Sequence, residues 1–499
     1  MGTIRRQSAY SSVFIFIGFA IGALNILVLF PKLLTQNEFA ITRGMVDISL
    51  TLATLCTLGS LNVVYKFYPF YSSYLKQKDN DLPFVTGVIC FTGYVLVLLT
   101  GLIFKDFIIR KLGKSPEFAP YFRTVYPFTF FLLLFTWLEA FGWSIRKTIL
   151  TNFLRETAVR LIATLLIILC AFHIISSSQF INLYSLSYLL PALILYFVLV
   201  RSGKWRFAWV SISSVTKRLK KRMISFGLFV FGAQFLNILS KTNDTILILG
   251  LRGLADMPVF VIASYLITVM ELPQRSLHAI SVPVLAEAWK NKDKARIDSL
   301  YKKSVSNLLV IALGMFGVIF LNATSLVAFL GKNYAQVPLL VFIMGIAKVI
   351  DLGTGVNSLV IGTSNYWKFD FYTNVIYTLF SIPLNVFLIK SLGLAGLAYS
   401  YLISLTLYNL IRYTFIYKKF GFQPYSFTSL FAVLISAILY LIVYLVPHYS
   451  NIFIDVFLRS FLFLGLFAPA MYMLKISPDI NELVLTRVNR LASFIQSKR

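Results

Sequence analysis

The chain is built mainly of long apolar stretches separated by short polar segments. Fourteen stretches are long enough to cross a bilayer, because about 20 consecutive apolar residues in a helix span the hydrocarbon core. They lie near residues 11–34, 41–71, 83–109, 121–143, 151–175, 180–201, 223–250, 257–283, 304–330, 335–362, 367–390, 393–417, 425–447 and 451–474. The pattern predicts an all-α, polytopic membrane protein with about 14 transmembrane helices.

Composition agrees with a chain that faces lipid. Only 13% of the 499 residues are charged and 58% are hydrophobic, whereas a soluble domain carries about a quarter charged residues. The formal net charge of +27 would suggest nucleic acid in a soluble protein. Here the basic residues lie mainly in short loops between apolar stretches, so membrane topology explains them and no nucleic-acid partner is expected.

The positions of Lys and Arg predict the orientation in the membrane. Loops after even-numbered stretches are basic, and so is the C-terminal tail; the basic segments are 76–78, 146–147, 204–222, 290–296, 418–419 and 475–499. Loops on the other side hold few basic residues beyond the cluster Arg110, Lys111 and Lys114. Cytoplasmic loops carry the excess of Lys and Arg, so both termini are predicted to be cytoplasmic. The apolar run 11–34 is too long for a signal peptide and is expected to be an uncleaved first span.

Loop lengths predict the division of the chain. The two longest loops, 202–222 and 284–303, are both on the predicted cytoplasmic side, which leaves no room for an extracytoplasmic catalytic domain. Mid-span Asn25 and Asn237 mark a weak internal repeat, as in transporters built from two related halves. We predict an N-lobe of helices 1–6 (1–202), a basic cytoplasmic linker (203–222), a C-lobe of helices 7–12 (223–420), helices 13–14 (421–475) and a basic cytoplasmic tail (476–499).

Several charged residues fall inside predicted spans, where each costs about 2.5–3.5 kcal/mol at the bilayer centre. Five opposite pairs are three or four residues apart: Arg43–Asp47, Lys241–Asp244, Glu271–Arg275, Lys348–Asp351 and Asp455–Arg459. This spacing places both members of a pair on one face of a helix. Two interpretations stay open: each pair only neutralises itself, or the paired faces line a hydrated cavity in which an anionic ligand competes for the cations.

Four further basic residues are expected to be unpaired, because they have at most one acidic neighbour, Glu156. They are Lys66, Arg155, Arg160 and Arg412. They lie toward the predicted cytoplasmic ends of helices 2, 5 and 12, where they would contact either the head group of a ligand or the phosphates of membrane lipids. They favour an anionic ligand over a cationic one.

Four groups of short motifs occur in a specific order. The first two are Pro31–Ala40 and Leu58–Pro69, and the third is Asn243–Gly250 with residues 263–265 and Pro283. The fourth combines Gly331–Tyr334, residues 362–364, Pro383–Asn385 and residues 393–398. With these motifs, residues 8–420 resemble the polysaccharide flippase branch of the multidrug/oligosaccharidyl-lipid/polysaccharide exporter superfamily. Ala40 departs from the family pattern, which has Gly at this position.

The resemblance implies an alternating-access transporter of two six-helix lobes with two additional C-terminal helices. It implies a location in the bacterial inner membrane, as a multi-pass protein. The implied substrate is an undecaprenyl-pyrophosphate-linked oligosaccharide, moved from the cytoplasmic to the periplasmic leaflet for lipopolysaccharide or O-antigen synthesis. A polysaccharide polymerase is a candidate partner, and membrane lipid surrounds the protein.

A pyrophosphate presents several acceptor oxygens, which Arg binds in bidentate fashion and Lys as a point charge. The residues expected to contact the head group are Arg43, Lys66, Lys241, Arg275 and Lys348. The candidates for secondary basic contacts are Arg155, Arg160 and Arg412. The carboxylates that could couple transport to H⁺ or Na⁺ are Asp244, Glu271 and Asp351, although each could serve only to pair with its basic neighbour.

The sequence predicts a transporter and not an enzyme, without catalytic residues, metal ligands or a resident cofactor. It contains no G-x-x-x-x-G-K-[ST] nucleotide motif, and its three cysteines have no metal-ligand spacing. Alternatives are a peptidoglycan lipid-precursor flippase, which shares the mechanism, and a cation-coupled multidrug exporter, which would prefer an acidic or aromatic cavity. A membrane polysaccharide polymerase or ligase is a weaker alternative because His173, His278 and His448 are scattered and no large outside loop exists.

Overall fold

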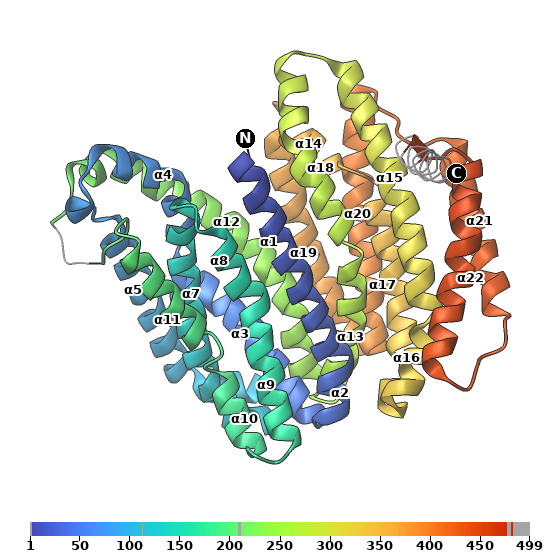
Figure 1. The fold of residues 1–499 in the computed structure, drawn as a ribbon, viewed down its shortest axis with the longest axis horizontal. Coiled ribbons are helices and arrows are strands. Elements are labelled where there is room, and N and C mark those ends of the chain that lie inside the picture. Colours follow the sequence, from blue (N-terminus) through green and yellow to red (C-terminus); the bar gives the residue numbers. More distant parts are fainter. Residues whose placement is uncertain (1, 112, 208–210, 477–480, 483–499) are drawn as a thin grey trace, which may run out of the picture. The chain divides into compact units, whose positions relative to one another are not determined.

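The computed structural model of the protein describes residues 2–111, 113–207, 211–476 and 481–482. The side chains of residues 2–12, 233, 236–237, 239–241 and 279 lie outside the described part, which therefore excludes the side chain of the predicted contact Lys241 and nearly all of the predicted tail 476–499. All regular structure in the described residues is helical (Figure 1). The predicted all-α membrane fold is confirmed.

The chain forms two compact units, Met1–Val261 (unit 1) and Ile262–Arg499 (unit 2). This boundary lies beyond the predicted linker 203–222, because the helix after the linker, α12 (Ser214–Leu251), packs against α3 (Gln36–Thr57) and α4 (Ser60–Tyr74) of unit 1. The six-plus-six division into transport lobes stays a prediction.

The remaining helices of unit 1 are α1 (Gly2–Leu24), α2 (Phe30–Leu33), α5 (Leu82–Ile103), α6 (Lys105–Lys111), α7 (Val125–Ser144), α8 (Thr148–Asn152), α9 (Val159–Ala171), α10 (Ser177–Tyr184) and α11 (Leu189–Arg201). A π-helical turn, Phe153–Ala158, joins α8 to α9. Helix α7 packs against α3, α4 and α11, and α1 packs against the α8–α9 segment. Thus α7 is a central helix of this unit.

The predicted span 41–71 is two helices in the structure. Leu58 and Gly59 both have left-handed backbone angles, with φ of 45° and 79°, which end α3 and start α4. Glycine is required at the second position, because a Cβ on Gly59 would lie 2.2 Å from the carbonyl oxygen of Gly227. At its other end α3 begins with a capping box formed by Thr35 and Glu38, which gives a structural role to two residues of the first motif.

A buried carboxylate holds the start of α12 within unit 1. Asp81, which is fully buried, accepts hydrogen bonds from the backbone N–H of Ser213 (2.9 Å) and the hydroxyl of Thr216 (2.8 Å). Ser213 is the N-cap of α12, so the negative charge of Asp81 also lies at the positive end of the helix dipole. The short 76–81 loop therefore fixes where the long helix begins.

Unit 2 contains α14 (Leu272–Lys290), α15 (Lys294–Leu321), α16 (Ala323–Leu330), α17 (Val337–Leu352), α18 (Asn357–Gly362), α19 (Trp367–Leu392), α20 (Leu394–Phe420), α21 (Phe427–Tyr444) and α22 (Ile452–Met473). Helix α13 (Asp256–Val269) crosses the boundary between the units and is bent by 42° from α14. Helix α17 packs between α15 and α20, and the last two helices pack on α15 (Figure 1).

Eleven helices in the described residues are long and apolar enough to cross a membrane, or twelve if α13 and α14 form one bent span. The other two predicted spans, 151–175 and 223–250, are also helical. The first carries Arg155, Glu156 and Arg160, which lower its hydropathy, and the second includes side chains outside the described part. The count of 14 spans and the cytoplasmic position of both termini stay predictions.

We expect Asp81→Ala to destabilise the protein by about 1–3 kcal/mol, because two buried donors at the start of α12 lose their acceptor. Thermal unfolding of the detergent-solubilised full chain should show a lower apparent Tm. The matched control is Asp79→Ala, which removes an exposed carboxylate from the same loop. Equal Tm values for the two variants would contradict this role of Asp81.

Candidate functional site

Four predicted residues form one ion-pair network in unit 2. The ammonium of Lys348 on α17 donates to Glu271 Oε1 (2.8 Å) and to Asp351 Oδ2 (3.1 Å). Arg275 Nη2 donates to the other oxygen of Glu271 at 3.2 Å. Both predicted pairs of this region are therefore present, and the Lys348–Glu271 contact links them into one cluster. The cluster holds two cations and two carboxylates.

Amide and hydroxyl groups extend this network toward α20. Asn409 Nδ2 donates to Asp351 Oδ1 at 2.9 Å. The side-chain oxygen of Asn409 accepts in turn from Thr354 and Asn357, both at 2.9 Å. Each carboxylate oxygen of Asp351 thus has a donor, so this side of the network is held firmly by the protein itself.

The two cations differ in accessibility. The side chain of Lys348 is only 6% exposed, whereas that of Arg275 is 65% exposed and pairs with one carboxylate, Glu271, among the described residues. An exposed guanidinium with a single partner can exchange that partner for a ligand at small cost. We therefore regard Arg275 as the accessible end of the network and Lys348 as its buried centre.

The opposite face of α17 borders a large apolar cavity of about 820 Å³. Ile346, Val349, Ile350 and Gly353 line this cavity from α17 and its C-terminal end, together with side chains of α15 and α21 such as Phe316, Phe320, Val433 and Tyr440. The spacing of 346, 349, 350 and 353 is that of one helical face, and Lys348 and Asp351 lie on the other. One helix therefore separates a charged network from an apolar cavity.

In unit 1 the predicted pair Arg43–Asp47 is present, with Nη2 and Oδ1 3.6 Å apart. Asp47 Oδ2 also accepts from the hydroxyl of Thr245 on α12, at 2.7 Å. Asp244 interacts electrostatically with Asp47, so this candidate coupling carboxylate lies near the α3–α12 contact. The pairing of Lys241 with Asp244 lies outside the described residues.

The expectation that Arg155 and Arg412 lack acidic partners is wrong. Arg155 forms an ion pair with Glu139 on α7, and Arg412 forms one with Asp370 on α19. Both partners are distant in sequence and become neighbours only when the helices pack. Arg412 also lies over the ring of Tyr408, so it is fixed from two sides.

Arg160 and Lys66 have no ion pair with a carboxylate distant in sequence among the described residues, as expected. Arg160 pairs with its sequence neighbour Glu156 at 2.9 Å. The ammonium of Lys66 lies 3.9 Å from the centre of the Phe226 ring, which is a cation–π contact. The pair Asp455–Arg459 is almost fully buried, and Asp455 also accepts from Ser325 and the backbone of Tyr449, which fits a purely structural role.

Glu139, the single charged residue of α7, was not among the predicted site residues. Its side chain is 1% exposed and its partner Arg155 is 35% exposed. Both line a polar cavity of about 350 Å³ within unit 1, between α3, α4, α7, α12 and the π-helical turn. Glu139 could have been recognised from the sequence as a candidate site residue, because a lone carboxylate inside an otherwise uncharged predicted span needs a partner.

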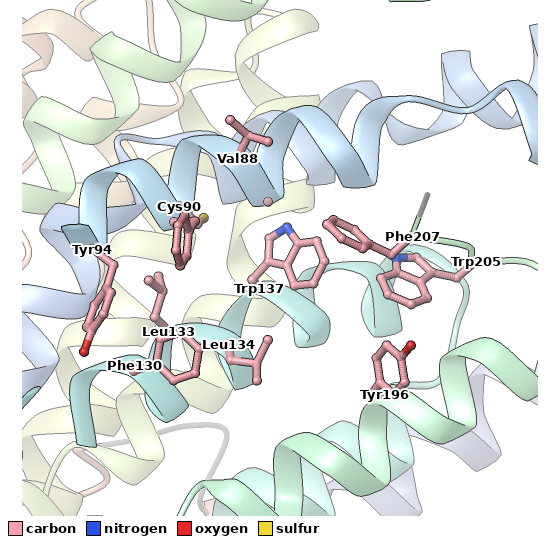
Figure 2. Close-up of a pocket in the computed structure, with 12 residues that line it drawn as sticks. Val88, Cys90, Tyr94, Phe130, Leu133, Leu134, Trp137, Tyr196, Trp205 and Phe207 are labelled. Atoms are coloured by element: carbon pink, nitrogen blue, oxygen red, sulfur yellow. The ribbon is translucent and has the colours of Figure 1, made fainter. Parts of the chain in front are cut away.

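A second cavity of unit 1, of about 370 Å³, has an aromatic lining. Trp137 of α7, Tyr196 of α11, and Trp205 and Phe207 beyond α11 face one another there (Figure 2). None of its lining residues is charged, and none was predicted as a site residue. Its aromatic side chains pack the beginning of the predicted linker against α5, α7 and α11.

We expect Arg155→Gln to destabilise the protein by about 2–4 kcal/mol, because the buried Glu139 carboxylate loses its cation. Glu139→Gln should cost less, since the guanidinium that it leaves behind reaches solvent or cavity water. The double variant should resemble Glu139→Gln alone. Apparent Tm values of the four proteins in one detergent test this order, and equal losses in the two single variants would refute it.

No family model and no curated protein matches the chain. Solved structures do. A structure described as lipid II flippase MurJ in an inward closed conformation is similar with a TM-score of 0.72 and 15% identity, covering 93% of this chain and 98% of that one. An inward-facing multidrug resistance MATE family transporter of the MOP superfamily follows with a TM-score of 0.63 and 13% identity, over 82% and 98% of the two chains.

A further MATE structure, in a bent conformation, has a TM-score of 0.55 at 13% identity, over 84% of this chain and 95% of that one. These structural neighbours are transporters and not enzymes. The polytopic helical architecture of this chain is therefore the fold of MOP-superfamily transporters, the fold that the MurJ flippase and the MATE transporters share.

Proposed function

We propose that the protein is an alternating-access transporter of the MOP superfamily that flips an undecaprenyl-pyrophosphate-linked oligosaccharide from the cytoplasmic to the periplasmic leaflet. The observation that supports this best is the position of α17 between a charged network and an apolar cavity of about 820 Å³. A lipid-linked sugar is an amphiphile with a doubly charged head group and a long apolar tail. Such a molecule needs both environments close together.

The head group would compete with the carboxylates for their cations. Its oxygens could accept bidentate hydrogen bonds from Arg275, the exposed member of the network, while Lys348 supplies the positive charge behind it. Glu271, which now accepts from both cations, would be displaced. Its ion pair with the exposed Arg275 is worth little. At the buried Lys348 the incoming phosphate oxygens would take the place of the carboxylate, so that no buried cation is left unpaired.

Tail binding is the role we assign to the apolar cavity between α15, α17 and α21. Its lining consists mainly of Leu, Ile, Val and Phe side chains. Contact between these side chains and a hydrocarbon tail is favourable because it removes apolar surface from water. The charged residues of α17 lie on its other face. The tail could therefore stay in an apolar environment while the head group moves through a polar one.

Energy for export can come from the membrane potential. Two negative charges that move outward across an inside-negative potential of about 100 mV gain roughly 4–5 kcal/mol. Coupling to H⁺ or Na⁺ would require a carboxylate that is alternately loaded and released, for which Glu271, Asp351 and Asp244 remain our candidates. Of these, Glu271 is the carboxylate that would lose its basic partners when the head group binds, and it could then take up a cation.

Two related functions compete with this proposal. The similarity to a lipid II flippase favours a peptidoglycan lipid-precursor flippase, which would use the same network and cavity for a different glycan. The similarity to MATE transporters favours a multidrug exporter, but Lys348 and Arg275 would repel a cationic drug. A bacterial inner-membrane location and a polysaccharide polymerase partner belong to the proposal itself.

We expect Lys348→Ala to reduce transport at least about tenfold, because the head group loses the charge at the centre of the site. The assay uses proteoliposomes that contain polyprenyl-pyrophosphate-linked N-acetylglucosamine, and an external lectin reports the sugar that reaches the outer leaflet. The matched control is Lys302→Ala, which removes a half-exposed lysine paired with Asp298 on α15. Transport by a folded Lys348→Ala protein at the control rate would refute the proposed site.

A further inference from the structure

The polar cavity of unit 1 contains a buried hydrogen-bond acceptor without a donor. Glu139 Oε2 accepts from Arg155, but Glu139 Oε1 is buried and has no hydrogen-bond partner among the described residues. A buried acceptor that stays unsatisfied costs about 1–3 kcal/mol, and more if it is charged. Because Glu139 lines the cavity, a molecule that enters the cavity can supply the missing donor.

The other polar groups of the cavity are uncharged. Asn62 and Gln234 form an amide pair across α4 and α12, with Nδ2 and Oε1 3.0 Å apart. The hydroxyl groups that line the cavity are those of Thr54, Thr57, Thr136 and Tyr65. Since Glu139 and Arg155 neutralise each other, the lining as a whole has no net charge. It suits a neutral ligand that both donates and accepts hydrogen bonds.

The cavity also has a flat aromatic wall. The ring of Tyr65 lines it and stacks on Trp143, with ring centres 5.5 Å apart. A volume of about 350 Å³ is within the range of small-molecule sites. The cavity thus places an aromatic face beside amides, hydroxyls and an unpaired carboxylate oxygen. Such a lining matches a ligand whose ring is apolar on its faces and polar on its edge.

We propose that this cavity binds a neutral sugar residue, with one sugar hydroxyl donating to Glu139 Oε1 and others exchanging hydrogen bonds with Arg155 and the Asn62–Gln234 pair. The geometry assigns a neutral polyhydroxyl ligand. The choice of a sugar rests on the proposed function, in which the cargo carries an oligosaccharide. A monovalent cation is disfavoured because the Arg155 guanidinium, which already pairs with Glu139, would repel it.

The experiment titrates the full-length protein in lipid nanodiscs with glucose, galactose and N-acetylglucosamine while tryptophan fluorescence is recorded. Trp143 stacks on the wall of the cavity, so binding should change its emission, and a Trp143→Phe protein should lack this change. We expect a saturable response to at least one sugar. Glu139→Gln should weaken it about tenfold, because a charged acceptor is replaced by a neutral amide.

The matched control is Glu156→Gln. Glu156 interacts electrostatically with Glu139 and pairs with Arg160, but it does not line the cavity, so sugar binding should be unchanged. Thr136→Val serves as a second cavity variant that removes a hydroxyl and no charge. It should also weaken binding, and it keeps the test valid if Glu139→Gln folds poorly.

Three results would overturn the proposal: no saturable response to any sugar, equal affinity in the cavity variants and the wild-type protein, or the same fluorescence change with Na⁺ or H⁺ alone. The last would identify a cation site instead. The assay contains neither a pyrophosphate nor a lipid-linked substrate, so its outcome is independent of the proposed role of Lys348. If the wild-type protein binds no sugar but its flipping depends on Lys348, only the sugar site is refuted. If it binds sugar but its flipping does not depend on Lys348, only the head-group site is refuted.

Discussion

A charged side chain inside a membrane must find an opposite charge or water, and this requirement organises both units. Each buried cation described above, whether Lys348, Arg412 or Arg459, contacts at least one carboxylate. Such pairs do more than cancel charge. Lys348, Arg155 and Arg412 each take a partner from a different segment, so breaking the helix packing would leave unpaired charges in a medium of low dielectric constant. The pairs therefore help to specify which helices are neighbours.

The same requirement would make binding at the proposed head-group site reversible. In the Lys348 network the carboxylates hold the cations in place. Under the proposed function, a pyrophosphate would replace a carboxylate without leaving an unpaired charge on the basic residues. Asp351, which is held by Asn409 as well as Lys348, would stay in place, whereas Glu271 would be released. The network thus has a fixed half and an exchangeable half.

The sequence predicted those parts of the structure that depend on local spacing. The apolar stretches and the pairs Arg43–Asp47, Glu271–Arg275 and Lys348–Asp351 follow from helix periodicity alone. The contacts Arg155–Glu139 and Arg412–Asp370 could not be predicted in this way, because they depend on which helices pack together. The break at Leu58–Gly59 was missed for a similar reason: its close contact with Gly227 belongs to another part of the chain. The packing of α12 on α3 and α4 likewise has no signature in sequence spacing.

The two faces of α17 restrict how this helix can move. Adjacent residues, Lys348 and Val349, point into opposite environments, since successive side chains are about 100° apart around the axis. A roll of the helix by half a turn would bring the Lys348 ammonium toward the apolar cavity and Val349 toward the carboxylates, at a cost of several kcal/mol. Tilting and sliding along the axis keep each face in its own surroundings. In any conformational change of this protein, we therefore expect α17 to move as a helix that tilts or slides but does not rotate about its own axis.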